Sequence, residues 1–258
     1  MRLMKRILSA AAVLALSASL LVGCSSGTAS SVPVSASSAA ESTVSSVEET
    51  ASSAVDENAA AAEQLLNDLT GSYQELWPVI LADEYKQTWL DDCTALVGED
   101  NAEAAFEKLS SMVTGDVYGE DAVKAYANGG GAYFCGFTNS LAILTFDGET
   151  STISGTDKDG NMLFSHTYHY IGMEPVRGLY EFQSDDADSG EFTYFFLAPD
   201  TSAETYHIEF RYGSDAEALS QYDTGEYAYW LASGISTDCD QTMIDNCIEL
   251  FCTENLAG

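Results

Sequence analysis

The spacing of hydrophobic residues divides the chain into a helical region followed by a strand-rich region. Between residues 56 and 127, apolar side chains recur at helical spacing, which is typical of helices that bury one face. Gly98 and the glycines at 129–131 are well placed to end two of these helices. The pattern predicts helices over residues 56–70, 83–97, 101–112 and 121–127.

Beyond residue 131 the hydrophobic period changes to two, which is typical of strands with one buried face. Clusters of turn-forming residues, such as 157–161 and 185–190, separate the strand-like runs. Seven short antiparallel strands favour a sandwich or a small closed barrel. They are predicted over residues 132–137, 141–146, 151–155, 162–171, 178–183, 192–197 and 205–212. A short helix is expected from Ser214 or Asp215, and an amphipathic helix over 240–254.

The amino terminus has the layout of a secretory signal, with Arg2, Lys5 and Arg6 followed by an apolar stretch over 7–22. The residues Leu-Val-Gly-Cys that end at Cys24 resemble the bacterial lipobox, in which the cysteine receives long acyl chains such as palmitate. We therefore expect a lipoprotein signal peptide over residues 1–23, lipidation at Cys24 and attachment to the outer face of the cell membrane by lipid alone.

The stretch over residues 24–56 is mostly Ser, Ala, Thr, Val and Glu and contains no aromatic residue. Such a composition cannot bury enough apolar surface to offset its ordering entropy, so we expect a disordered tether. Every Trp, Tyr and Phe lies in residues 57–258, which predicts a single globular domain of about 200 residues.

Charge favours cations as partners. Three of the nine basic residues lie in the predicted signal, so the remaining chain carries six Lys and Arg against 41 Asp and Glu, a net charge of about −35. This charge opposes binding to nucleic acid or to an anionic membrane through the protein surface. Solubility of a surface protein is a sufficient alternative reason for most of these carboxylates.

Five cysteines remain besides Cys24, so they cannot all pair within one chain. Export permits one or two disulfides, but their connectivity cannot be deduced from the sequence. Cys247 and Cys252 lack the spacing of a zinc knuckle, and we interpret them as core residues of the last helix. The remaining three are Cys93, Cys135 and Cys239.

Known catalytic and calcium-binding motifs are absent from the sequence. The turns that begin at Asp157 and Asp185 fail the EF-hand pattern and are interpreted as hairpin turns. No nucleophile elbow and no phosphate loop occurs, so we expect a protein that is not an enzyme. The alternative is a catalytic pair among the many carboxylates, but the sequence singles out no such pair.

The predicted strand over 205–212 carries the main candidate chemistry. Its alternation places Thr205, His207, Glu209 and Arg211 on one face, so His207 and Glu209 can point at one cation above the sheet. The alternative is a solvated polar face on which Glu209 pairs with Arg211.

Four segments resemble the ZinT family of extracytoplasmic zinc-binding proteins. Residues 66–78, LNDLTGSYQELWP, are similar to the family segment L-x-D-x-x-G-x-W-x-S-V-Y-P. Residues 167–170, TYHY, are similar to its K-Y-x-Y segment. Residues 194–200 and 207–213 align with the family segments Y-x-x-F-S-D-H and H-F-H-I-x-x-G, which supply three zinc-binding histidines.

The resemblance implies a metal site and a fold. Only His207 keeps a family histidine, whereas Glu209 and Asp200 occupy the other two ligand positions. His169 is a further candidate, as a ligand or as a hydrogen-bond partner of one, and a plain strand histidine is its alternative. The resemblance implies Zn²⁺ as the metal. The replacement of two histidines by carboxylates shifts the expected preference toward harder cations such as Mn²⁺ or Ca²⁺. The implied fold is a calycin- or lipocalin-like antiparallel barrel with flanking amino-terminal and carboxy-terminal helices, an α+β fold that is mainly β.

The function implied by the resemblance is surface capture of zinc or another divalent metal for an uptake system, with the binding protein of a metal ABC transporter as a possible partner. The alternative is a lipocalin-like barrel module that has lost the metal site and binds a small organic ligand or another surface protein. Aromatic residues such as Tyr168 and Phe195 are typical of a barrel cavity, and also of an ordinary barrel core.

Overall fold

The computed structural model describes residues 57–257 of the 258-residue chain. The predicted signal peptide over 1–23, the predicted tether over 24–56 and the lipidation site Cys24 lie outside the described residues. Within residues 57–257, no helix is both long and apolar enough to cross a membrane.

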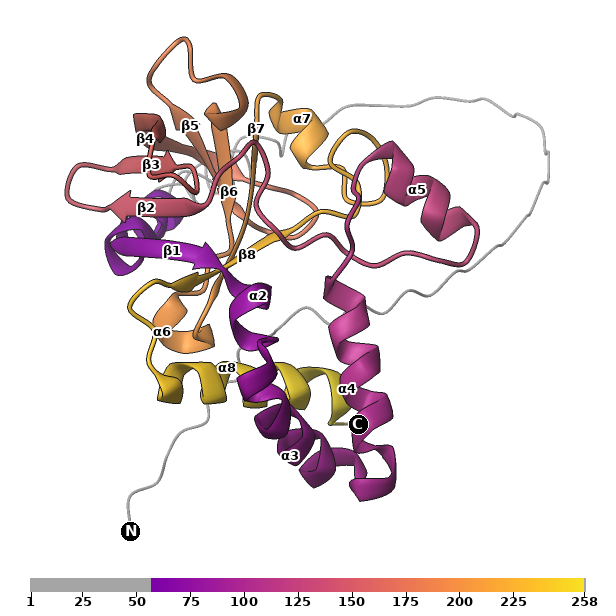
Figure 1. Cartoon of the computed structure of the whole chain (residues 1–258). Coiled ribbons are helices and arrows are strands. Elements are labelled where there is room, and N and C mark those ends of the chain that lie inside the picture. The colour runs from indigo at the N-terminus through magenta and orange to yellow at the C-terminus, as the bar shows by residue number, and fades with distance from the viewer. Residues whose placement is uncertain (1–56, 258) are drawn as a thin grey trace, which may run out of the picture. The chain divides into compact units, whose positions relative to one another are not determined.

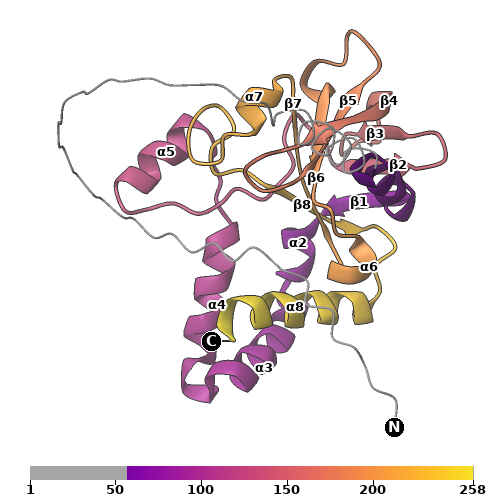
Figure 2. The same cartoon turned by 180° about the vertical axis from the view of Figure 1, so that it is seen from behind.

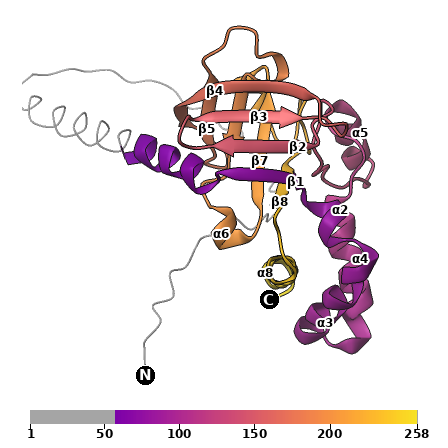
Figure 3. The ribbon, with the colours of Figure 1, turned by 60° about the vertical axis from the view of Figure 1, so that its left-hand side comes forward.

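Eight antiparallel strands form one closed barrel, in which consecutive strands pair and β8 returns to pair with β1 (Figure 1, Figure 3). Closure pairs every strand on both sides, so the barrel has no free edge. The strands are β1 (Gly71–Glu75), β2 (Ile143–Asp147), β3 (Thr152–Thr156), β4 (Met162–Met173), β5 (Tyr180–Ser184), β6 (Tyr194–Leu197), β7 (Ile208–Gly213) and β8 (Ala232–Ser236). An antiparallel barrel with flanking helices confirms the predicted fold class.

The barrel core comes from the alternation seen in the sequence. Along β4, Phe164 and Tyr168 are buried, whereas Ser165 and Thr167 between them face solvent. Opposing residues of antiparallel strands share a face, so Phe182 of β5 meets Phe195 of β6, and Phe195 in turn meets Tyr212 of β7. These rings fill the interior.

Two segments outside the strands add to this core. Residues 57–68 are helical and contribute Leu65 and Leu66 to it. The segment that carries Phe137 is held by two barrel side chains: the Phe137 amide donates to the Glu75 carboxylate at 2.6 Å, and the Thr138 amide donates to the Tyr212 hydroxyl at 2.6 Å.

Four helices form a second core on one side of the barrel (Figure 2). Trp89, Leu109 and Ile248 are almost fully buried in it, and the Trp89 indole donates to the Ile80 carbonyl at 2.7 Å. The contributing helices are α2 (Leu76–Ile80), α3 (Lys86–Val97), α4 (Glu99–Val113) and α8 (Gln241–Leu256). The remaining short helices are η1 (Asp83–Tyr85), α5 (Glu120–Ala127), η2 (Gly190–Phe192), α6 (Ser202–Thr205) and α7 (Ala216–Leu219).

One predicted strand is absent from the structure, and two observed strands are not predicted by the sequence pattern. The segment 132–137 is not a strand, because only Phe134 in it makes isolated bridges, to Thr114 and Trp230. Strands β1 and β8 were not expected, since their sequences, GSYQE and ASGIS, lack the aromatic and β-branched alternation of the others. Pairing with their neighbours in the barrel, rather than their own propensity, makes them strands.

The predicted strand over 205–212 begins late. Thr201 and Glu204 form a reciprocal capping box that starts α6, and Tyr206 then adopts a left-handed conformation with φ 67°. Strand β7 therefore starts at Ile208, and His207 precedes it rather than lying within it.

Candidate functional site

His207 lies at the junction between the left-handed Tyr206 and β7, and it is partly buried. Its Nδ1 donates to the Thr205 carbonyl at 2.8 Å, because a carbonyl oxygen can only accept. The same nitrogen lies 3.9 Å from the Cys247 sulfur of α8. The imidazole is thus fixed between the chain that leads into β7 and the last helix, with Nδ1 occupied.

The surroundings raise the pKa of His207 to about 9. Burial acts to lower this pKa, but the hydrogen bond with Cys247, the interaction with its thiol and the negative charge of Glu209 outweigh burial. The imidazole therefore carries a proton at neutral pH. A cation that binds here must displace that proton.

Three carboxylates share this neighbourhood. Partial loss of solvation raises the pKa of Glu254 on α8, the charge of His207 lowers it, and the negative charges of Glu209 and Asp200 raise it. The charges of the three predicted ligands therefore all affect the pKa of one carboxyl group, that of Glu254; these ligands are His207, Glu209 and Asp200. Asp200 and Glu254 are exposed, and Glu209 is partly buried.

Cys247 and Glu254 were not predicted to belong to this site. They are seven positions apart on α8, which places them on the same helix face, two turns apart. That spacing was visible in the sequence, but nothing in the sequence indicated that this face packs beside His207. The prediction that Cys247 and Cys252 are core residues is confirmed, because both are buried.

His169 and Arg211 have other partners. The His169 ring is half-exposed on the outer face of β4, and its Nδ1 lies 2.6 Å from Asp185 Oδ1. Arg211 does not pair with Glu209, so that alternative is wrong. Its guanidinium is fully buried and donates to the carbonyls of Leu219, Gln221 and Tyr227.

The predicted ligands do not form a preorganised metal-coordination site. Among residues 57–257, no three His, Cys, Asp or Glu side chains are arranged so that they could hold a metal ion. The structure thus brings His207, Glu209 and Asp200 into mutual electrostatic range, without converging them on one point. The assignment of metal ligands stays a prediction.

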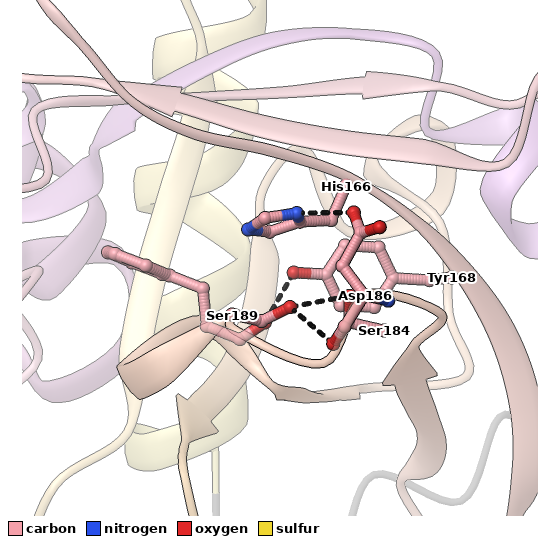
Figure 4. Close-up of polar contacts among 6 residues, drawn as sticks. His166, Tyr168, Ser184, Asp186 and Ser189 are labelled. Carbon is pink, nitrogen blue, oxygen red and sulfur yellow. Dashed lines mark hydrogen bonds and ion pairs between the residues drawn. The ribbon is translucent and has the colours of Figure 1, made fainter.

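A second polar cluster surrounds the turn after β5 (Figure 4). His166 Nδ1 lies 2.7 Å from Asp186 Oδ2, and the Ser189 hydroxyl donates to the Ser184 hydroxyl at 2.7 Å. The Tyr168 hydroxyl donates to the Phe192 carbonyl. No hydrogen bond within this cluster joins a serine hydroxyl to His166, so it lacks the nucleophile–base contact of a serine hydrolase. The cluster instead fixes the turn.

The interior of the barrel is occupied by aromatic rings. Phe195 and Tyr212 are fully buried with ring centroids 5.3 Å apart, and Phe210 lies 5.9 Å from Tyr212. Two hollows of about 490 and 310 Å³ lie beside α2 and share Glu75 and Pro78 in their walls. Both are open to solvent rather than enclosed by the strands.

Comparisons with known proteins found similar solved structures, among them two Zn(II)-bound structures. The Zn(II)-bound ZinT-like domain of Streptococcus pneumoniae AdcA is 15% identical over 72% of this chain and 89% of that domain, with a TM-score of 0.45. Zn(II)-bound AdcA from Streptococcus pneumoniae is 14% identical over 70% of this chain and 34% of its own, with a TM-score of 0.42. No family model and no curated protein matches the chain.

Proposed function

We propose that this protein is a lipid-anchored extracytoplasmic protein that binds a divalent metal, first of all zinc, and captures or buffers it for an uptake system. The observation that carries the proposal is that His207 contacts Cys247 where β7 meets α8, with the carboxylates of Glu209, Asp200 and Glu254 close enough for charge interactions within the same neighbourhood. Nitrogen, sulfur and carboxylate oxygen are the ligand atoms that zinc prefers.

His207 is oriented as zinc-binding histidines commonly are. Its Nδ1 donates to the Thr205 carbonyl, which fixes the ring and leaves Nε2 as the nitrogen that can coordinate a metal. Glu209, Asp200 and Glu254 would then turn toward the ring as the cation replaces the proton on His207. A site whose ligands come together only when the metal ion binds is compatible with capture of the ion followed by its release.

Cys247 changes the expected metal preference. Two carboxylates with one imidazole favour harder cations such as Mn²⁺ and Ca²⁺, whereas a thiolate within reach favours zinc. The Cys247 sulfur lies 3.9 Å from the His207 ring, so this soft ligand is close to the predicted site. Zinc is therefore our first choice over calcium and manganese.

The proposal places the protein on the outer face of the cell membrane, held by acyl chains on Cys24. Its partners would be the metal ion and the binding protein of a metal transporter. Nucleic acid is disfavoured, because six basic residues stand against 41 acidic ones outside the predicted signal. We propose no catalytic activity.

The alternative function, a barrel that encloses a small organic ligand, is less well supported. Phe195, Phe210 and Tyr212 are 0% exposed and in contact within the barrel. A ligand would have to displace these packed rings, at the cost of the burial energy that they contribute.

The test measures bound metal in the purified full chain after equilibration with Zn²⁺ and desalting. We expect near-stoichiometric zinc in the wild-type protein, a large loss in His207→Ala and little change in His169→Ala, whose ring contacts Asp185 instead. Equal trace zinc in all three proteins would refute the proposal. Loss in His169→Ala as large as in His207→Ala would show that the metal binds elsewhere.

A further inference from the structure

Two buried cysteines from distant parts of the chain face each other in the helical core. Cys93 of α3 and Cys252 of α8 are separated by 159 positions, yet their sulfur atoms lie 3.9 Å apart. Both side chains are 0% exposed. The contact joins the carboxy-terminal helix to the first long helix after β1.

We propose that Cys93 and Cys252 form a disulfide bond in the exported protein. In this step, both S–H bonds break and one S–S bond forms. The two electrons and two protons pass to a disulfide oxidant, which leaves as two thiols. The predicted signal peptide supports the proposal, because exported proteins meet oxidants of this class.

Forming the bond requires only a small displacement. A disulfide has an S–S length of about 2 Å, so the two sulfurs must approach by roughly 2 Å from their present contact. Rotation of each side chain about its Cα–Cβ bond moves its sulfur, and neither helix carries a further covalent constraint in the described part of the chain. The pairing leaves the packing of α3 against α8 in place.

The other described cysteines have different neighbours. The Cys135 sulfur lies 3.9 Å from the Tyr133 carbonyl, and burial with the charge of Glu209 raises the pKa of its thiol to about 12. Cys247 contacts the His207 ring. Cys239 is only partly buried. Among residues 57–257, the contact between Cys93 and Cys252 is the one hydrogen-bond-range contact between two sulfurs.

Burial determines when the bond can form. Cys93 and Cys252 are both 0% exposed, so an oxidant in solution cannot reach either sulfur in the folded protein. Thiol–disulfide exchange requires access to the attacking sulfur. The bond should therefore form while α8 is not yet packed, and afterwards resist reduction. The bond would tie α8, which carries Cys247 and Glu254, to α3, whether or not metal binds.

The test uses the full chain produced with its own signal in a bacterium that exports it. Cells are denatured in acid, free thiols are blocked with N-ethylmaleimide, and unreduced peptides are analysed by mass spectrometry. We expect linked peptides that contain Cys93 and Cys252, with Cys135, Cys239 and Cys247 carrying maleimide. Maleimide on both Cys93 and Cys252 in most molecules would overturn the proposal.

Two variants check the specificity of the link. Cys252→Ser should abolish it and leave Cys93 labelled, whereas Cys239→Ser, which removes a partly buried cysteine near the start of the same helix, should leave the link intact. A reducing agent applied to the folded wild-type protein should cleave the bond far more slowly than the same agent in denaturant. A link in wild type that instead joins Cys252 to any other cysteine would also refute the proposal.

Discussion

Arg211 and Glu174 are the two charged residues buried in the described region, with exposed fractions of 0% and 1%. The Arg211 guanidinium donates to the carbonyl of Leu219 at the end of α7 and to those of Gln221 and Tyr227 before β8. The centroid of the Tyr222 ring lies 4.3 Å from the central carbon of this guanidinium. The carbonyl oxygens, the aromatic face and the negative charge of Glu174 together compensate the buried positive charge.

Replacing Arg211 should therefore destabilise the protein strongly. In Arg211→Ala the carbonyls of Leu219, Gln221 and Tyr227 lose their donor, and we expect the free energy of unfolding to fall by about 3 kcal/mol or more, measured by urea denaturation. Lys124→Ala, which removes only exposed ion pairs, is the control and should change little. A small loss in Arg211→Ala would show that water replaces the guanidinium.

His207 should make stability depend on pH. Its pKa in the folded protein is about 9, above the ordinary value of 6.5, so the folded state binds the proton more tightly than the unfolded state. The contribution of protonated His207 to the free energy of unfolding is fully present below pH 6.5 and is lost as the pH rises through about 9. We expect wild type to exceed His207→Gln in unfolding free energy by on the order of 2 kcal/mol at pH 6, with the difference shrinking by pH 9.5. A constant difference would contradict the raised pKa.

Two histidines on opposite faces of β4 contact the turn after β5. His166 contacts Asp186, and His169, three residues further along the strand, contacts Asp185. His166 is 17% exposed and His169 54% exposed, so solvent screens the second pair more strongly.

This difference in exposure predicts that alanine substitutions of His166 and His169 lower the free energy of unfolding by unequal amounts. His166→Ala should lower the free energy of unfolding by about 1–2 kcal/mol, and His169→Ala by less than about 1 kcal/mol. Hydrogen exchange should report the effect locally, as faster exchange of the Phe192 and Thr193 amides in His166→Ala. Equal costs for the two substitutions would indicate that exposure does not set the strength of these pairs.

The sequence predicted the elements with strong periodicity and missed those that depend on the barrel. The strand over 162–171 corresponds to β4, and the helix over 240–254 to α8, because each has a clear apolar face. Strands β1 and β8 are polar or small-residue segments that become strands only by pairing with each other and with their neighbours. The site depends on a similar long-range packing, since Cys247 and Glu254 reach His207 only when α8 lies beside β7.

At the scale of the whole molecule, the charge opposes folding. Outside the predicted signal, six basic residues face 41 acidic ones, so the compact state concentrates negative charge that the unfolded chain spreads out. Ion pairs relieve little of it, because the lysine pairs in the described part of the chain are exposed. Screening by salt should therefore favour the folded state.

Monovalent salt should raise the thermal unfolding midpoint of the full chain. The Debye length falls from about 30 Å at 0.01 M to about 10 Å at 0.1 M, so repulsion between exposed carboxylates farther apart than this is largely screened at the higher salt concentration. We expect a rise of several degrees over this range by calorimetry, and an equal rise with choline chloride in place of sodium chloride, because screening does not depend on which cation supplies it. A rise with sodium alone would point to specific cation binding, and a fall would show that attractive pairs outweigh the repulsion.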